Sequence, residues 1–223
     1  MKDILCTIVT PDYIDRALTV WRSAEESGTH IDFVVLTTGP VSVDLPGITV
    51  LSLQELATRD SRAHKVKEKY SGESDPVRWS LKPVLMSHLL RAPSIERVVY
   101  SDCDTCFFRT PYILLDSLGD GDVLLTPHWR PLEPDGSSRG FRINFLDGLF
   151  NAGCVAANRK GVDALDWWAR ACLYACEKDY ERGLFHDQRY LDLLPIYFPN
   201  TTICRHQGFN LAWISTRPNS PNT

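Results

Sequence analysis

Residues 97–109 read RVVYSDCDTCFFR, a short apolar run that ends at two aspartates one residue apart, Asp102 and Asp104. The residues before the aspartates (VVY) are β-branched or aromatic, which predicts a buried β-strand. Side chains at positions i and i+2 of an extended chain point the same way, roughly 7 Å apart. Two carboxylates presented together in this way can bind one hard divalent cation, such as Mg²⁺ or Mn²⁺.

An Asp-x-Asp pair is a short motif that also arises by chance. The chain contains a second pair, Asp120 and Asp122, in the sequence LGDGDVLL. Asp and Gly are typical turn residues, so this second pair predicts a turn before a strand. The pair at 102 and 104 follows a strand without turn residues around it, and this position favours a functional role.

Cys103 and Cys106 form a C-x-x-C motif in the same stretch, which can bind zinc or exchange disulfides. A structural zinc site needs a second pair of ligands, and only Cys172 and Cys176 offer one, within a predicted amphipathic helix. We therefore interpret all seven cysteines as buried, unreactive side chains. Their odd number and scattered positions do not match a disulfide framework, which predicts a reducing, cytoplasmic location.

The composition is that of an ordinary globular protein and argues against several functional classes. The chain has 223 residues, 43% of them hydrophobic, and a net charge of −4, so nothing indicates binding to nucleic acid. No run of about 18 apolar residues is present, so we expect no transmembrane segment. We expect a single domain at 1–215, made of two fused halves (about 1–105 and about 106–215), and a polar tail at 216–223.

Strand and helix patterns alternate in the first half of the chain. The expected elements are strands at 4–9, 31–36 and 48–53 and a helix at 14–24. A second helix is expected to begin near Ser80, with Pro83 in its first turn. This alternation predicts an α/β fold with a mostly parallel central sheet and helices on both faces. Ligands bind at the carboxyl ends of the strands in such sheets, which is where the first aspartate pair lies.

Five segments follow one another in an order that resembles a known family. They are WSLKPVLMSHLL (79–90), VVYSDCDTCFF (98–108), FNAGCVAANR (150–159), HDQRYLDLLP (186–195) and HQGFNLAW (206–213). Together they resemble the GT-A fold glycosyltransferases, most closely the glycogenin-like retaining family, and the resemblance covers residues 10–213. It implies a Rossmann-like GT-A fold and a metal-dependent transfer of a sugar from a nucleotide-sugar, such as a UDP-hexose, to a carbohydrate or glycan acceptor.

The resemblance also implies roles for particular residues. Asp102, Asp104 and His206 would bind Mn²⁺ or Mg²⁺, and Asp187 and Gln188 would lie near the anomeric carbon as the catalytic pair. The implied donor-binding residues are Thr10, Asp12, Tyr13, Arg78, Lys82, Asp102 and Asn151.

Within the donor set, Tyr13 would stack on the base. Lys82 would be the basic residue near the donor, with Arg78 as its substitute. The place of Asp12 before a helix also suits a helix N-cap.

The chain departs from the family pattern after HQGF, where the family's diphosphate-binding lysine is absent. Three alternatives remain open. One is an inverting enzyme with Asp187 as general base, and another is a nucleotidyltransferase, although VTPDYIDRA lacks the Gly-rich loop that would hold a triphosphate. The third is a non-catalytic carbohydrate-binding module, for which the six Trp are the best argument. We expect the acceptor to lie against residues 130–147 and the C-terminal half, with this segment closing as a lid.

Overall fold

The computed structural model describes residues 1–28, 30–42, 44–130, 139–206, 208 and 209. The elements in chain order are β1 (Lys2–Val9), η1 (Pro11–Tyr13), α1 (Ile14–Glu26), β2 (Asp32–Thr37), β3 (Ile48–Ser52), α2 (Leu53–Arg59), α3 (Ser61–Lys69), α4 (Ser74–Leu90), β4 (Ile95–Ser101), α5 (Tyr112–Leu118), β5 (Val123–Pro127), α6 (Arg139–Asp147), β6 (Phe150–Asn158), η2 (Arg159–Gly161), α7 (Val162–Tyr174), β7 (Lys178–Asp179), β8 (Leu184–Phe185), η3 (Gln188–Leu193), α8 (Leu194–Tyr197) and β9 (Thr201–Ile203).

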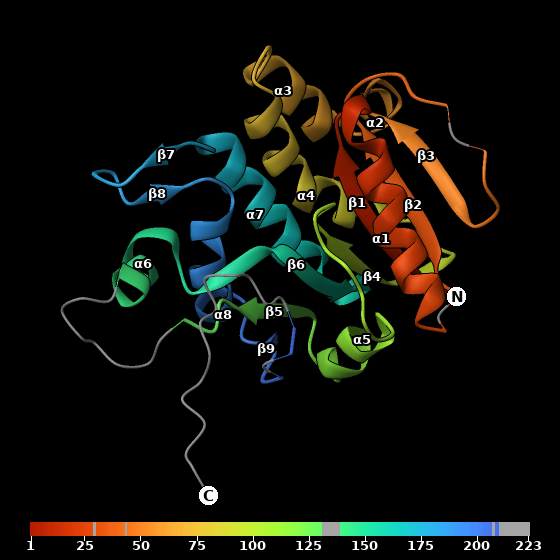
Figure 1. Ribbon diagram of the computed structural model, residues 1–223. Coiled ribbons are helices and arrows are strands. Elements are labelled where there is room, and N and C mark those ends of the chain that lie inside the picture. Colours follow the sequence, from red (N-terminus) through yellow and green to blue (C-terminus); the bar gives the residue numbers. More distant parts are fainter. Residues whose placement is uncertain (29, 43, 131–138, 207, 210–223) are drawn as a thin grey trace, which may run out of the picture.

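A seven-stranded sheet with the order β3-β2-β1-β4-β6-β5-β9 forms the centre of the molecule (Figure 1). Strands β1 to β4 are parallel to one another. Strand β6 is antiparallel to both of its neighbours, and β9 is parallel to β5. The predicted α/β fold with a mostly parallel sheet is therefore confirmed, and one reversed strand lies beside the strand that ends at the first aspartate pair.

Helices cover both faces of this sheet, and the side-chain alternation of β1 shows why (Figure 1). Ile4, Cys6 and Ile8 face a core formed with α2, α3, α4 and α7. Leu5 and Val9 point the other way, into a core formed with α1 and α5. A strand that is buried on both faces must be apolar at successive positions, as the sequence of β1 is.

The helix expected to begin near Ser80 begins six residues earlier, at Ser74, so Pro83 lies in its interior. The expected start was wrong because the first turn of α4 is polar and lacks an apolar stripe. Proline in a helix interior removes one backbone hydrogen bond. Here Pro83 and most of the surrounding α4 side chains are buried between the sheet and α7, and such packing overrides local propensity.

Two shorter helices, α2 and α3, were not expected from the sequence. A signal for α2 was nevertheless present, because Ser52 and Glu55 form a capping box in which each side chain bonds the other's backbone N–H. Further along the chain, α6 occupies the second half of residues 130–147, the segment expected to close as a lid. Residues 131–138 of that segment and the predicted tail at 216–223 lie outside the described residues.

Charged side chains join three of the helices on the α4 face of the sheet, namely α3, α4 and α7. Asp166 of α7 accepts hydrogen bonds from Arg62 of α3 and from Arg91, the residue after α4. Arg62 also forms an ion pair with Asp60, with 2.5 Å between Nη2 and Oδ2. These contacts hold the ends of α3, α4 and α7 in a fixed relation.

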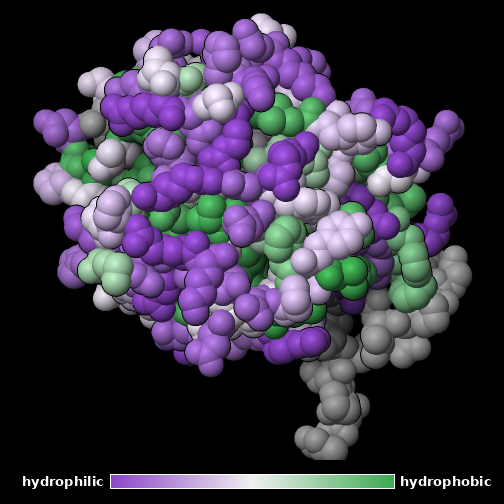
Figure 2. All heavy atoms as spheres, turned by 180° about the vertical axis from the view of Figure 1, so that it is seen from behind, coloured by the Kyte–Doolittle hydropathy of each residue, from purple (hydrophilic) through white to green (hydrophobic). Residues whose placement is uncertain are grey.

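The outer surface is mixed in polarity. Figure 2 shows hydrophilic residues over much of one face, with hydrophobic residues in separate areas between them. Within the described ranges, no helix has both the length and the apolar character needed to cross a membrane.

Candidate active site

The carboxylate of Asp102 lies against β6 at the carboxyl end of β4. The backbone N–H of Asp102 donates to the carbonyl of Gly153 at 2.8 Å, which continues the β4–β6 pairing by one residue. A Cβ at Gly153 would lie 2.8 Å from Oδ2 of Asp102. Glycine at this position therefore lets the carboxylate approach the backbone of the FNAG segment.

Lys82 lies between Asp102 and Asp187 and is almost fully buried, with 3% of its surface exposed. Its Nζ is 3.2 Å from Oδ1 of Asp102 and 3.3 Å from Oδ2 of Asp187. It also donates to the carbonyl of Ala152 at 3.3 Å. The contact with Asp187 lacks hydrogen-bond geometry, so it is an ion pair, and Oδ2 of Asp187 accepts no directed hydrogen bond from the described residues. One ammonium thus joins α4, β4 and the segment after β8.

Burial and neighbouring charges shift the pKa values of Lys82 and Asp187. Desolvation disfavours the ammonium of Lys82, but the attraction of Asp102 and Asp187 is stronger, so the pKa of Lys82 is raised. Burial raises the pKa of Asp187 from about 3.8 to about 6; Lys82 opposes the shift and the charge of Asp102 adds to it. One ammonium does not fully compensate two carboxylates.

Tyr100, the penultimate residue of β4, contacts both Asp102 and Lys82. Its hydroxyl donates to Oδ1 of Asp102 at 2.8 Å, and its ring lies 5.3 Å from Nζ of Lys82. Burial and the neighbouring charge of Asp102 raise the pKa of Tyr100, so the phenol stays protonated and remains a donor. From the sequence, Tyr100 was expected only to be part of a buried strand.

Asn151 and Gln188 are held by the backbone around them. Oδ1 of Asn151 accepts from the N–H of Gly153 at 2.7 Å. Gln188 accepts from the N–H of Ala152 at 3.3 Å and donates to the carbonyl of Asp147 at 2.9 Å. Asn151 therefore lies within the FNAG segment that Asp102 contacts, and Gln188 lies beside this segment.

A cavity of about 250 Å³ lies beside the cluster formed by Lys82, Tyr100 and Asp102. It is lined by Ile8, Tyr13, Arg16, Arg78, Trp79, Lys82, Tyr100, Asp102, Cys103 and Asp104. Within it, the guanidinium carbons of Arg16 and Arg78 lie 4.4 Å and 5.9 Å from the centre of the Tyr13 ring. The structure thus brings together five of the predicted residues: Tyr13, Arg78, Lys82, Asp102 and Asp104.

Thr10 and Asp12 belong to the same strand-to-helix loop but do not line the cavity. Asp12 is exposed within η1, and the N-cap of α1 is Tyr13, without a side-chain cap bond. The alternative of Asp12 as the N-cap of that helix is therefore wrong, because Asp12 lies within η1 and the N-cap position falls on Tyr13.

The three predicted metal ligands do not form one cluster. Among the described residues, no group of three His, Cys, Asp or Glu side chains is close enough to share a cation. Asp102 and Asp104 line the same cavity, whereas His206 is exposed beyond β9, accepts a bond from the N–H of Gly208 at 3.0 Å and contacts the ring of Phe209. Two carboxylates with substrate phosphates are a sufficient oxygen set for Mg²⁺, so these two residues fit such an ion.

The cysteines are free thiols in the part of the chain that the structure describes. Five are buried, but Cys103 is half-buried in the cavity wall and Cys106 is exposed. The expectation that all seven are buried was wrong for these two, because the chain leaves the sheet after Ser101 and runs over the surface.

Four residues at this site were missed by sequence reasoning: Arg16, Trp79, Tyr100 and Gly153. Arg16 had a signal, since it lies three residues after Tyr13 and therefore on the same face of the first helical turns. Gly153 also had one, because glycine inside a strand pattern indicates a close approach of another group.

Two curated proteins of Bacillus subtilis (strain 168) are similar to this chain in sequence. The uncharacterized protein YfnF is 26% identical over 219 residues, which cover 95% of this chain and 72% of YfnF. The uncharacterized protein YfnD is 28% identical over 139 residues, covering 60% of this chain and 43% of YfnD. No family model matches the chain.

Solved glycosyltransferase structures share the fold. An active-site mutant of LgtC superposes with a TM-score of 0.59 at 17% identity, covering 91% of this chain and 72% of that chain. The galactosyltransferase LgtC in complex with donor and acceptor sugar analogs gives 0.51 at 16%, covering 91% and 73%. The apo bifunctional glycosyltransferase WbbM gives 0.54 at 15%, covering 91% and 38%. The chain therefore has the fold of these glycosyltransferases.

The raised pKa of Asp187 predicts a specific pH dependence of stability. The folded protein binds this proton more tightly than the unfolded chain, so the stabilisation is complete below about pH 4 and is lost as the pH rises through about 6. We expect the free energy of unfolding of the wild type, relative to Asp187→Asn, to fall by about 2 kcal/mol between pH 4 and pH 7.

Denaturant unfolding at each pH measures this difference. Ser42→Ala provides the control, because it changes an exposed side chain that has no ionisable group, so its difference should not change over this range. A pH-independent difference for Asp187→Asn would show that its carboxyl titrates as in the unfolded chain.

Proposed function

We propose that this protein is a glycosyltransferase that transfers a hexose from a nucleotide-sugar to a carbohydrate acceptor. The favoured donor is a UDP-hexose. The main support is the buried Lys82 between Asp102 and Asp187, in the wall of a cavity that also holds Tyr13 with two arginines. The shared fold with LgtC and WbbM agrees with this proposal.

The cavity suits a nucleoside diphosphate. Breaking the bond between the sugar and the diphosphate leaves negative charge on the phosphates, which positioned cations stabilise. Arg16 and Arg78 line the cavity near the Tyr13 ring, and Arg78 is also paired with Asp75. Guanidinium groups match phosphate oxygens in shape as well as charge. We assign them the diphosphate contact that the missing C-terminal lysine would make in the resembled family.

Mn²⁺ or Mg²⁺ is the proposed cofactor, bound by Asp102 and Asp104 together with diphosphate oxygens. The ion would act as a Lewis acid on the leaving phosphates. His206 remains a proposed third ligand on the basis of the resemblance. Tyr13 is proposed to stack on the base, with Thr10 and Asp12 near the base or ribose, and Asn151 near the donor sugar.

Retention is the stereochemical outcome we favour. A general base for an inverting reaction must reach the acceptor hydroxyl, but Asp187 is 2% exposed and its carboxylate faces Lys82. Gln188 is likewise fixed by two backbone contacts. We propose that Asp187 and Gln188 orient and polarise the donor sugar, and that the leaving phosphate assists the attack from the same face, as in the glycogenin-like family.

Binding of a nucleotide-sugar panel tests the proposal. Calorimetric titration with UDP-glucose, UDP-galactose, GDP-mannose and UTP, with and without Mn²⁺, should show metal-dependent binding of a UDP-sugar. Asp104→Ala should weaken it by at least about tenfold, because a carboxylate ligand is lost. Asp120→Ala, in the second Asp-x-Asp pair, is the matched control and should bind as the wild type does. Failure of every nucleotide-sugar to bind would refute the proposal, and turnover of UTP with a sugar phosphate would indicate a nucleotidyltransferase.

Removal of Arg16 tests the role of the cavity cations. Arg16→Ala should weaken UDP binding about tenfold at low salt, and the loss should shrink as the ionic strength rises, since a charge contact is screened. Arg22→Ala on the exposed surface of the same helix is the control. Equal UDP affinity in wild type and Arg16→Ala would remove Arg16 from the donor site.

Product analysis tests the stereochemistry. We expect NMR of the first product formed from an α-linked UDP-hexose to show an α-glycoside, because Asp187, the candidate base, is buried against Lys82. A β-glycoside would instead assign Asp187 the role of general base in an inverting reaction.

A further inference from the structure

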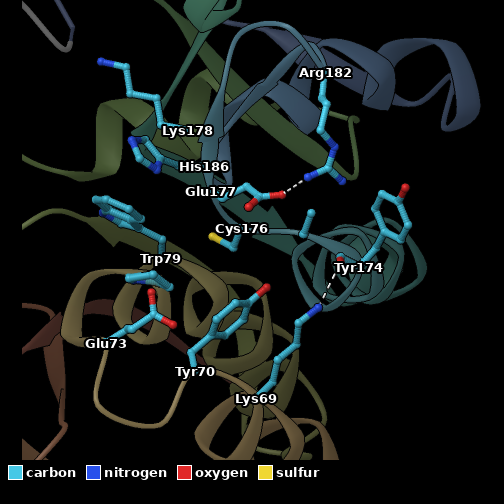
Figure 3. Close-up of a pocket in the computed structure, with 12 residues that line it drawn as sticks. Lys69, Tyr70, Glu73, Trp79, Tyr174, Cys176, Glu177, Lys178, Arg182 and His186 are labelled. Carbon is cyan, nitrogen blue, oxygen red and sulfur yellow. Dashed lines mark hydrogen bonds and ion pairs between the residues drawn. The ribbon is translucent and has the colours of Figure 1, made fainter.

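A second cavity of about 380 Å³ lies on the α4 side of the sheet. It is formed by the α3–α4 junction and by the segment that follows α7 (Figure 3). The side chains that matter for its chemistry are Lys69, Tyr70, Glu73, Trp79, Lys178 and His186. Its volume falls within the usual range for small-molecule sites, about 300–1,000 Å³.

This cavity and the candidate donor cavity share one wall. Trp79 lines both. On the side of the second cavity, the ring of His186 packs against the indole with 3.8 Å between ring centres (Figure 3). His186 is directly followed by Asp187, so the same short segment reaches from this cavity to the buried Lys82.

The backbone holds His186 in an unusual conformation. Its φ of 50° lies in the left-handed region, which is rare for a residue with a side chain. The N–H of His186 donates to the carbonyl of Glu177 at 2.9 Å and fixes this conformation. Such local strain concentrates at functional sites. Nδ1 of His186 is buried and has no hydrogen-bond partner among the described residues.

Two charged side chains at this cavity are available for a ligand. Arg182 is paired with Glu177, and Lys69 donates to the carbonyls of Leu173 and Tyr174 (Figure 3). In contrast, Glu73 and Lys178 make no ion pair or side-chain hydrogen bond within the described part of the chain; Lys178 contacts only the faces of aromatic rings. The carboxylate of Glu73 and the ammonium of Lys178 therefore have no charged partner among the described residues.

We propose that this second cavity is the acceptor site and that it takes a neutral pyranoside. The sugar ring would pack against the Trp79–His186 wall, and its hydroxyls would donate to Glu73 and accept from Lys178. Hydroxyl groups satisfy both kinds of partner at once, whereas an anionic ligand could pair with Lys178 but would leave Glu73 without a partner. The proposal rests on the proposed function and differs from the acceptor position expected against residues 130–147.

In the transfer step, an acceptor hydroxyl oxygen forms the new bond to the anomeric carbon of the donor. The bond between that carbon and the diphosphate oxygen breaks, and its electron pair stays on the diphosphate. The hydroxyl proton leaves with the diphosphate. Since Trp79 separates the two cavities, the acceptor hydroxyl would reach the donor sugar past the Trp79–His186 edge.

Saturation-transfer NMR with the methyl α- and β-glycosides of glucose, galactose and mannose tests the site, on protein loaded with UDP and Mn²⁺. We expect at least one glycoside to bind the wild type. Glu73→Gln and Lys178→Ala should each weaken that binding about tenfold, the scale of a hydrogen bond to a charged group. The controls Glu181→Gln and Lys65→Ala change exposed residues that do not line the cavity and should stay within about twofold of the wild type.

Calorimetry of UDP on the same variants separates the two proposals. UDP affinity should be unchanged in Glu73→Gln and Lys178→Ala, because neither residue lines the donor cavity. If the wild type binds UDP but no glycoside, or if both variants bind glycosides as the wild type does, the acceptor site is refuted and the proposed function stands. If the wild type binds no nucleotide-sugar, the proposed function itself fails.

Discussion

The ammonium of Lys82 is the contact on which the geometry of the site depends. It lies in the middle of α4, yet it meets a carboxylate at the end of β4, a second carboxylate after β8 and a backbone carbonyl of β6. Three segments that are far apart in the sequence are therefore held at one point. Loss of one partner from such a buried group leaves the others uncompensated, which is far more destabilising than loss of a surface ion pair.

The charge balance of this cluster bears on the proposed binding of a diphosphate in the adjacent cavity. Two carboxylates share one ammonium, and the raised pKa of Asp187 reflects the remaining negative charge. A phosphate group would be repelled by that charge alone. Arg16 and Arg78, stacked near Tyr13, supply positive charge at the other part of the cavity. The cavity is thus polarised, with a cationic region beside an acidic one, and this arrangement suits a diphosphate accompanied by a metal ion.

Much of the sheet could be predicted from the sequence because its strands are buried on both faces and appear as unbroken apolar runs. The start of α4 could not, because its first turn is polar and only the packing of residues such as Val77 fixes it. At the site, Lys82, Asp102, Asp187 and Gln188 were found through motifs, and the structure brings them together. Arg16 was missed because an arginine on an exposed helix face resembles any solvated residue. Trp79 and His186 were missed as a pair because their contact links segments more than one hundred residues apart.

The position of Cys103 between the two aspartates affects the reactivity of its thiol. Partial burial raises its pKa, and the negative charges of Asp102 and Asp104 raise it further. Oxidants and alkylating agents attack the thiolate rather than the thiol. Arg78 and Arg16 oppose this shift but do not cancel it, so the carboxylates that line the cavity also lower the thiolate fraction of a cysteine in its wall.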